Sequence, residues 1–344
     1  MTVMGRKALP GVAPDEAPLW RQILRGFSQC AFQCNELTAL FFIAAVFAHS
    51  WRMGVYYIIG VVLGTLTARL LGGDRTLAGL GLFGFNSGLM GLALGNFFVT
   101  DTALWIAVPI LAIIVGAVTV AAARWLPFPF LAAPFIAVFW VIWPLRSAVG
   151  LTAINLGAFG HSTVIYFLAV LHGAGSALFC ITTLSGVLFL LGILVANWRH
   201  SIVAAMGALV AALLASHAWA AGDAVNSGFA GFNAVLAAVA TYELVAADLR
   251  LALLASVVST WTFAFMNVNW PSPALASGFV ITVWMIMFLG WLNPRFNAAA
   301  PAGEPELESE PTAGQPPAPP LSGPRNPVAP GDVASRGQDI RRPG

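Results

Sequence analysis

The sequence predicts an all-α integral membrane protein in which about ten transmembrane helices form two inverted five-helix repeats with re-entrant or broken helices. Three observations support this fold class. Of the 344 residues, 59% are hydrophobic and only 9% are charged, whereas about 25% of the residues in soluble domains are charged. The apolar segments fall into two groups of five. A motif in the first group returns in the second.

The apolar segments are predicted to enter the membrane as helices. Several are shorter than the ~20 residues that cross a bilayer as a straight helix. We therefore expect some to be tilted, broken or re-entrant, as half-helices of transporters are. The ten segments are residues 36–50, 53–70, 79–98, 103–122, 128–145, 178–197, 202–220, 229–247, 251–267 and 274–292.

Arginines between these segments predict the orientation, because cytoplasmic connections carry an excess of Lys and Arg. If the N-terminus is inside, the outer connections hold only Arg52 and Arg146. The sequence thus predicts a multi-pass protein of the inner (plasma) membrane with both termini cytoplasmic. The arginines of the cytoplasmic connections are then Arg69, Arg75, Arg124, Arg199, Arg250 and Arg295.

Composition divides the chain into four parts. Residues 1–25 are predicted to be a cytoplasmic N-terminal segment, 26–146 the first membrane repeat and 147–295 the second. Residues 296–344 are rich in Pro, Ala and Gly, and half of the chain's 22 prolines follow residue 300. We expect this last part to be a disordered cytoplasmic tail.

Several classes of function are disfavoured. A net charge of +2 without a basic cluster argues against a nucleic-acid partner. Phosphate loops, metal-ligand spacings and nucleophile elbows are absent from the sequence. We therefore predict a protein that is not an enzyme, with no catalytic residues, no metal and no cofactor. Cys30, Cys34 and Cys180 are expected to be small core residues.

The internal repeat is the most informative feature of the sequence. Residues 81–89 read Gly-Leu-Phe-Gly-Phe-Asn-Ser-Gly-Leu, and residues 228–236, 147 positions later, read Gly-Phe-Ala-Gly-Phe-Asn-Ala-Val-Leu. Because five spans is an odd number, the second repeat must enter the membrane from the opposite side, and in such folds the solute site lies between the halves. The other matched pairs are residues 26–32 with 173–179, at the same offset, and residues 128–135 with 272–279, at an offset of 144.

Glycines of the first motif lie on one helical face, which lets another backbone approach closely. Close helix packing is therefore the expected role of this face. The glycines are Gly81, Gly84, Gly88, Gly91 and Gly95.

Aromatic and aliphatic side chains on a neighbouring stripe either pack in the core or line a pore. Phe85 and Leu89 form this stripe at a spacing of four residues. The repeat favours the pore, because three apolar residues of the first half have an identical residue at the matching position of the second half. The pairs are Phe85 with Phe232, Leu89 with Leu236, and Phe32 with Phe179.

Polar side chains accompany these phenylalanines. Asn86 and Asn233 follow two of them, and each either binds backbone exposed by a broken helix or contacts the solute directly, because a buried amide must be hydrogen-bonded. Gln29 lies one turn before Phe32 and offers an amide oxygen to a passing donor. Its partner in the repeat is Ser176.

Ionisable residues, which usually mark ion or proton routes, are few in the apolar segments. Glu36 and Glu243 lie near predicted ends, and His161, His172 and His217 match no position in the other half. A cation route is therefore disfavoured. His161 and His172 either lie at an interface or in the core, or line the conduction path.

Taken in order, the duplicated Gly-Phe-Asn-x-x-Leu blocks, the Gly-x-x-Gln-x-x-Phe segment and the Pro-x-x-x-x-Pro-Phe segment resemble the urea transporter family, of the bacterial urea channel type. The resemblance covers about residues 20–292. It implies ten spans in inverted halves, a homotrimer with one pore per subunit, and a urea-permeable pore.

In that family, two pairs of phenylalanines make slots for planar urea, and a line of oxygens accepts its amide protons. By resemblance, Phe32 and Phe85 form one slot and Phe179 and Phe232 the other, with Leu89 and Leu236 at the walls. The line of oxygens departs from the family pattern. Ala132 and Ala276 stand at positions usually held by threonine, Gly278 replaces a proline, and Ser176 replaces Gln or Glu.

These observations predict a channel that passes urea down its gradient, within a lipid bilayer. Two alternatives remain open. One is a channel on the same fold for another small neutral solute, such as ammonia, a short amide or water. The other is a membrane sensor that transports nothing.

Overall fold

The computed structural model describes residues 16–155, 157 and 159–292. Every regular element among them is a helix, beside one isolated bridge between Phe98 and Ala153. The predicted all-α class is confirmed for this part of the chain. The predicted tail, residues 296–344, and most of the predicted N-terminal segment lie outside the described residues.

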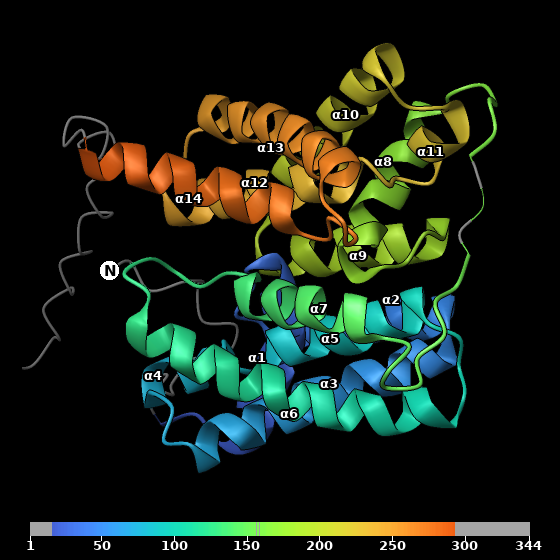
Figure 1. Cartoon of the computed structure of the whole chain (residues 1–344). Coiled ribbons are helices and arrows are strands. Elements are labelled where there is room, and N and C mark those ends of the chain that lie inside the picture. The colour runs from blue at the N-terminus through green and yellow to red at the C-terminus, as the bar shows by residue number, and fades with distance from the viewer. Residues whose placement is uncertain (1–15, 156, 158, 293–344) are drawn as a thin grey trace, which may run out of the picture. The chain divides into compact units, whose positions relative to one another are not determined.

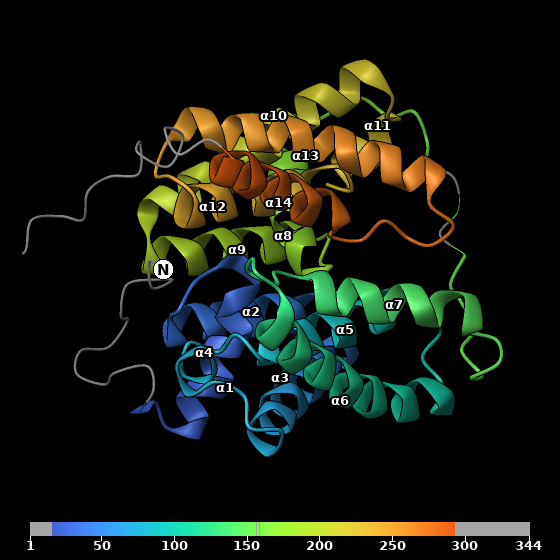
Figure 2. The same ribbon diagram turned by 60° about the vertical axis from the view of Figure 1, so that its left-hand side comes forward.

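Two groups of helices follow one another along the chain, with the same order of long, short and 3-10 elements in each. In both views the groups lie on opposite sides, and α2 and α9 adjoin where they meet (Figure 1 and Figure 2). The first group is α1 (Leu19–Ser28), η2 (Gln29–Ala31), α2 (Glu36–His49), α3 (Trp51–Leu70), α4 (Arg75–Gly79), α5 (Gly84–Phe97), α6 (Thr102–Trp125) and α7 (Ala133–Leu145). The second is α8 (Tyr166–Gly175), η3 (Ser176–Leu178), α9 (Thr183–Ala196), α10 (Trp198–Ala218), α11 (Gly222–Asn226), α12 (Gly231–Leu244), α13 (Leu249–Asn269) and α14 (Ser277–Leu292).

Helix length and composition identify the membrane spans. Among the described residues, α3, α6, α10 and α13 are long and apolar enough to cross a membrane. Two bent pairs raise the number to six if each pair is one span: α1–η2 with α2, at 68°, and α8–η3 with α9, at 73°. At 14 residues each, α5 and α12 extend about 21 Å, less than the ~30 Å of the hydrocarbon core. The expectation of broken helices is confirmed.

Several helices begin later than their apolar segments, because a left-handed residue interrupts the backbone first. Gly81 has φ 81° before α5, Leu131 has φ 48° before α7, and Leu275 has φ 50° before α14. Hydropathy does not report such interruptions. It also missed α1 and α8, and α1 begins before the boundary drawn at residue 26.

Four of the five glycines predicted on one helical face lie on α5 and pack against α3, whereas Gly81 precedes the helix and faces α1, where a Cβ would lie 2.5 Å from the nitrogen of Gly26. A Cβ at Gly91 would strike the carbonyl oxygen of Tyr56, and a Cβ at Gly84 would lie 2.6 Å from Oγ1 of Thr65. On α3, a Cβ at Gly60 would strike the carbonyl oxygen of Ser87. The two helices therefore approach at backbone distance, which small residues permit in membranes.

Substituting Gly60 by alanine is expected to destabilise the protein by about 1–3 kcal/mol, the usual effect of overpacking, since the obstacle is backbone. Thermal unfolding of the purified protein in detergent would measure this. Gly157→Ala is the matched control, because nothing in the described chain lies within 4 Å of a Cβ there. Equal melting temperatures for the two variants would contradict the packing described.

Four of the hydrogen bonds between the two groups form two reciprocal pairs. Thr38 of α2 donates to the carbonyl of Gly192 in α9 at 2.7 Å, and Ser185 of α9 donates to the carbonyl of Ala45 in α2 at 2.7 Å. Since Thr38 precedes Ala45 and Ser185 precedes Gly192, α2 and α9 run antiparallel. The indole N–H groups of Trp140 and Trp284 form a second such pair, donating to Pro273 and Pro129, each at 2.9 Å.

Candidate functional site

Each bent helix pair is interrupted at a phenylalanine with left-handed backbone. Phe32 ends η2 with φ 60° and donates its N–H to Gln29 at 3.0 Å. Phe179 ends η3 with φ 58° and donates its N–H to Ser176 at 2.9 Å. Bulky residues rarely adopt this conformation outside constrained sites. Two residues predicted for the site are thus held in unusual and nearly identical geometry.

A second pair of interruptions precedes α7 and α14, and an asparagine binds each one. Asn86 donates to the carbonyl of Leu131 at 2.9 Å and accepts from the N–H of Phe135 at 3.2 Å. Asn233 makes the same two bonds, to Leu275 and from Phe279, each at 2.9 Å. Of the two roles considered for these asparagines, the structural one is confirmed.

Phenylalanine rings from opposite helix groups meet at the first two interruptions. The ring centroids of Phe32 and Phe279 are 6.1 Å apart at 77°, and those of Phe179 and Phe135 are 6.4 Å apart at 90°. Phe135 and Phe279 were not among the residues predicted for the site. The signal was available, because both end the repeated proline segment.

The other two predicted phenylalanines have partners within their own groups. Phe85 stacks on Phe130 at 6.1 Å, and Phe232 contacts Phe263 at 5.5 Å. Among the described ring pairs, Phe32 with Phe85 and Phe179 with Phe232 do not occur.

The elements that carry the four phenylalanines nevertheless meet. The turn η2 contacts α5, α12 and η3, and η3 contacts α12. The remaining apolar residues predicted for the site are buried on or next to these elements. They are Leu89 on α5, Leu236 on α12, and Ala132 and Ala276 directly after the left-handed leucines.

Gln29 leaves one hydrogen-bond acceptor unused at the first interruption. Its side chain is 1% exposed, and Nε2 donates to the carbonyl of Leu80 at 2.7 Å. Its Oε1 is buried and has no partner in the described chain. The repeat partner, Ser176, donates to the carbonyl of Ser227 at 3.5 Å. A buried free oxygen is costly unless something binds it.

A polar side chain lies one helical turn before Gln29 and another one turn before Ser176. Arg25 is buried, pairs with Glu36 at 2.9 Å and donates to the carbonyl of Gly79 at 2.7 Å. His172, 147 positions later, contacts the carbonyl of Asn226 at 2.6 Å and Thr183 at 3.1 Å. The statement that His172 matches no position in the other half was therefore wrong. The repeat there conserves hydrogen-bond geometry while the residue type differs.

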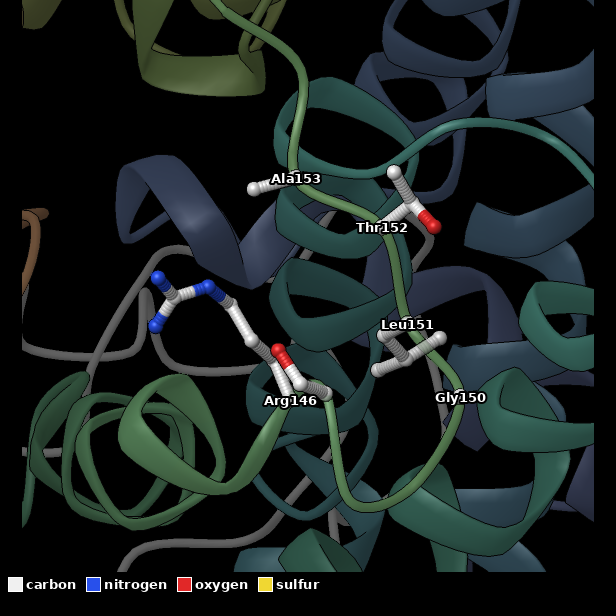
Figure 3. Close-up of a pocket in the computed structure, with 6 residues that line it drawn as sticks. Arg146, Gly150, Leu151, Thr152 and Ala153 are labelled. Carbon is white, nitrogen blue, oxygen red and sulfur yellow. The ribbon is translucent and has the colours of Figure 1, made fainter.

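A surface hollow of about 410 Å³ lies beside the segment that follows α7. In Figure 3, Arg146 and Thr152 point to opposite sides of this segment. None of its lining residues was predicted for the site, and none contributes a ring to the interruptions. The lining residues are Arg146, Ser147, Gly150, Leu151, Thr152 and Ala153.

The fold and the site together define a membrane protein of many helices, in which broken helices from two similar groups meet at aromatic rings, an arrangement common among transporters. A family model described as "Urea transporter" matches residues 20–291. The chain belongs to the urea transporter family, a family of transporters and not of enzymes.

Curated relatives share about a quarter of their residues with this chain. It is 25% identical over 235 residues to "Urea transporter 1" of Rattus norvegicus, 25% over 240 residues to that of Ovis aries, and 24% over 235 residues to that of Mus musculus. Each match covers 63% of this chain and 61% of the relative. The chain thus spans about three fifths of the length of these curated relatives.

Proposed function

We propose that the protein is a passive channel that conducts urea between the two interruptions at Phe32 and Phe179. The observation that carries this proposal is the free, buried Oε1 of Gln29, three residues before a left-handed phenylalanine whose ring meets Phe279 of the other group. Family membership and the name of the relatives, "Urea transporter 1", support urea as the solute.

We further propose ten spans in two inverted repeats, with Phe85 and Phe232 completing the two aromatic ends. The reciprocal bonds between α2 and α9 support a two-fold relation between the helix groups. Thr38 of the first group donates to Gly192 of the second, and the counterpart of Thr38, Ser185, donates to the counterpart of Gly192, Ala45. Since these helices run antiparallel, the axis crosses them at right angles. An axis in the membrane plane is the mark of inverted repeats.

The orientation proposed for the channel has both termini in the cytoplasm of a cell bounded by its inner, or plasma, membrane. Arg124 donates to the carbonyl of Leu71 at 2.7 Å, so the ends of α6 and α3, both assigned to the cytoplasm in this proposal, lie on the same side. Assembly as a homotrimer, with one pore in each subunit, belongs to the same proposal.

Selectivity in this mechanism follows from the chemistry of the walls. Flat apolar rings offer an ion nothing in place of its hydration water, so ions are excluded. The narrow space between the rings excludes bulky solutes. Urea is planar, neutral and rich in N–H donors, so Gln29 Oε1 offsets part of its dehydration. Asn86 and Asn233 are occupied by backbone, and Ala132 and Ala276 offer no hydroxyl. Backbone carbonyls therefore supply the remaining acceptors.

Stopped-flow light scattering on proteoliposomes tests the proposal. We expect urea permeability above that of empty vesicles, and Gln29→Leu should lower it by about 2- to 10-fold, the equivalent of one net hydrogen bond. Gln22→Leu is the matched control, because Gln22, on α1, is likewise a buried glutamine whose oxygen has no partner in the described chain, seven residues before Gln29.

Other solutes separate the alternatives in the same vesicles. Conduction of acetamide, methylammonium or water without urea would assign a different solute to this fold. Permeability equal to that of empty vesicles for every solute would refute a channel and leave a sensor.

A further inference from the structure

Three side chains connect the interruption at Phe32 to the second helix group. Gln33 follows Phe32 directly, and its Nε2 lies 2.7 Å from the carbonyl oxygen of Ala31 and 3.0 Å from Nδ1 of His200 at the start of α10. The other ring nitrogen of His200, Nε2, lies 3.2 Å from the carboxylate of Glu243 near the end of α12. Neither Gln33 nor His200 was among the residues predicted for the site.

The donors and acceptors in this chain of contacts fix one another. The amide nitrogen of Gln33 carries two hydrogens, one for the Ala31 carbonyl and one for His200. Nδ1 of His200 must then be an acceptor, so its proton lies on Nε2 and is donated to Glu243. With this orientation of the Gln33 amide, the contacts around His200 are satisfied by a neutral imidazole with its proton on Nε2.

A second proton on His200 breaks this pattern. It would place an N–H on Nδ1 against the N–H of Gln33. If the Gln33 amide turned over to present its oxygen, the Ala31 carbonyl would lose its donor. Either change removes a hydrogen bond within two residues of Phe32, whose left-handed backbone depends on its surroundings.

Protons can reach His200 through Glu243, whose side chain is 19% exposed while that of His200 is buried. In the described chain, the titratable groups in contact with the imidazole are Glu243 and Tyr242, both from α12. The segment after η2 contributes the uncharged amide of Gln33. Arg199, the neighbour on α10, directs its guanidinium over Trp198.

The interruption at Phe179 is built differently. At the offset of 147, Cys180 takes the place of Gln33 and donates to the carbonyl of Leu178 at 3.2 Å, which reproduces the first contact. The positions of His200 and Glu243 are taken by Met53 and Asn96. The titratable contact therefore serves one of the two aromatic ends.

We propose that Gln33, His200 and Glu243 are positioning residues that set the conformation of Phe32, so that the protonation state of His200 controls solute passage at that end of the channel. This inference rests on the proposed channel for its functional part. Its structural part, the link from His200 through Gln33 to the backbone on either side of Phe32, stands separately.

Fluorine NMR tests the structural part without transport. With 4-fluorophenylalanine at position 32, we expect the ¹⁹F resonance to move when the pH is varied between about 5 and about 8. The titration should vanish in His200→Gln and in Gln33→Leu. It should persist in His217→Gln, a matched control, because His217 is exposed and bonds within its own helix. A resonance that ignores pH, or one that titrates equally in His200→Gln, would overturn the inference.

Permeability in proteoliposomes tests the functional part. Between the same pH limits, the ratio of methylurea to urea permeability should change by about threefold, within the range of one net hydrogen bond, and should be constant in His200→Gln. An identical pH profile in parent and His200→Gln would overturn control by His200. If the ¹⁹F resonance titrates as expected but no urea flux exists, the link to Phe32 stands and the channel proposal fails.

Discussion

Replacing Asn86 by leucine is expected to cost most of the folded protein. The substitution leaves the buried carbonyl of Leu131 and the buried N–H of Phe135 without partners. Each unpaired group costs about 1–3 kcal/mol, so the loss is about 2–6 kcal/mol, a large part of the stability of a typical domain. Asn233→Leu should behave alike, because its two bonds are equivalent. The monodisperse fraction in detergent and its melting temperature would measure both effects.

Asn269→Leu is the control for these variants, since Asn269 is exposed and donates only to Phe265 of its own helix among the described contacts. It should retain the yield of the parent. Parental stability in Asn86→Leu would show that the interruption before α7 holds without its amide.

Truncation of Phe85 to alanine is expected to widen one aromatic end, and to raise permeability for solutes larger than urea more than for urea itself. Its ring is buried and stacks on Phe130 at 6.1 Å. Removing a phenyl group opens space that a methylated urea can occupy, and we expect the methylurea to urea ratio to rise by about tenfold, or ~1.4 kcal/mol. Phe232→Ala should act in the same way at the other end.

Phe42→Ala provides the comparison that separates a pore from a core. Phe42 is fully buried and stacks on Phe189 at 4.8 Å where α2 meets α9. Both variants lose the about 3–5 kcal/mol typical of a buried ring, but only Phe85→Ala should alter the ratio. If folded yield and flux fell in parallel in both, Phe85 would be a core residue.

The sequence predicts the helices well because apolar composition and membrane solvation decide where they form. Each of the ten predicted segments overlaps a helix, and four of the five predicted glycines lie on the face of α5 that packs against α3. The interruptions were harder to locate. Leu131 and Leu275 are ordinary apolar residues in sequence, and their left-handed backbone is fixed by Asn86 and Asn233, which lie over 40 residues away.

The candidate site could be predicted in part. Repetition pointed to Phe32 and Phe179, and the structure gives both the same unusual backbone. Comparison of the two repeats could not predict a role for His200, because its counterpart, Met53, carries no ionisable group. It also misjudged His172, which keeps the bonding pattern of Arg25 with a different side chain. A functional residue that occurs in only one of the two repeats cannot be found by comparing the repeats with each other.

The contact between Phe32 and Phe279 has a consequence for biosynthesis. A ribosome releases Phe32 long before α14 exists, so the nascent chain must hold one wall of the site in the membrane while its opposite wall is still being translated. An apolar ring without its partner is well solvated by lipid. The indole N–H of Trp140 also lacks its acceptor until Pro273 has been translated. A chain that ends before α14 therefore lacks Phe279 and one wall of the site, so the site is complete only once α14 has been made.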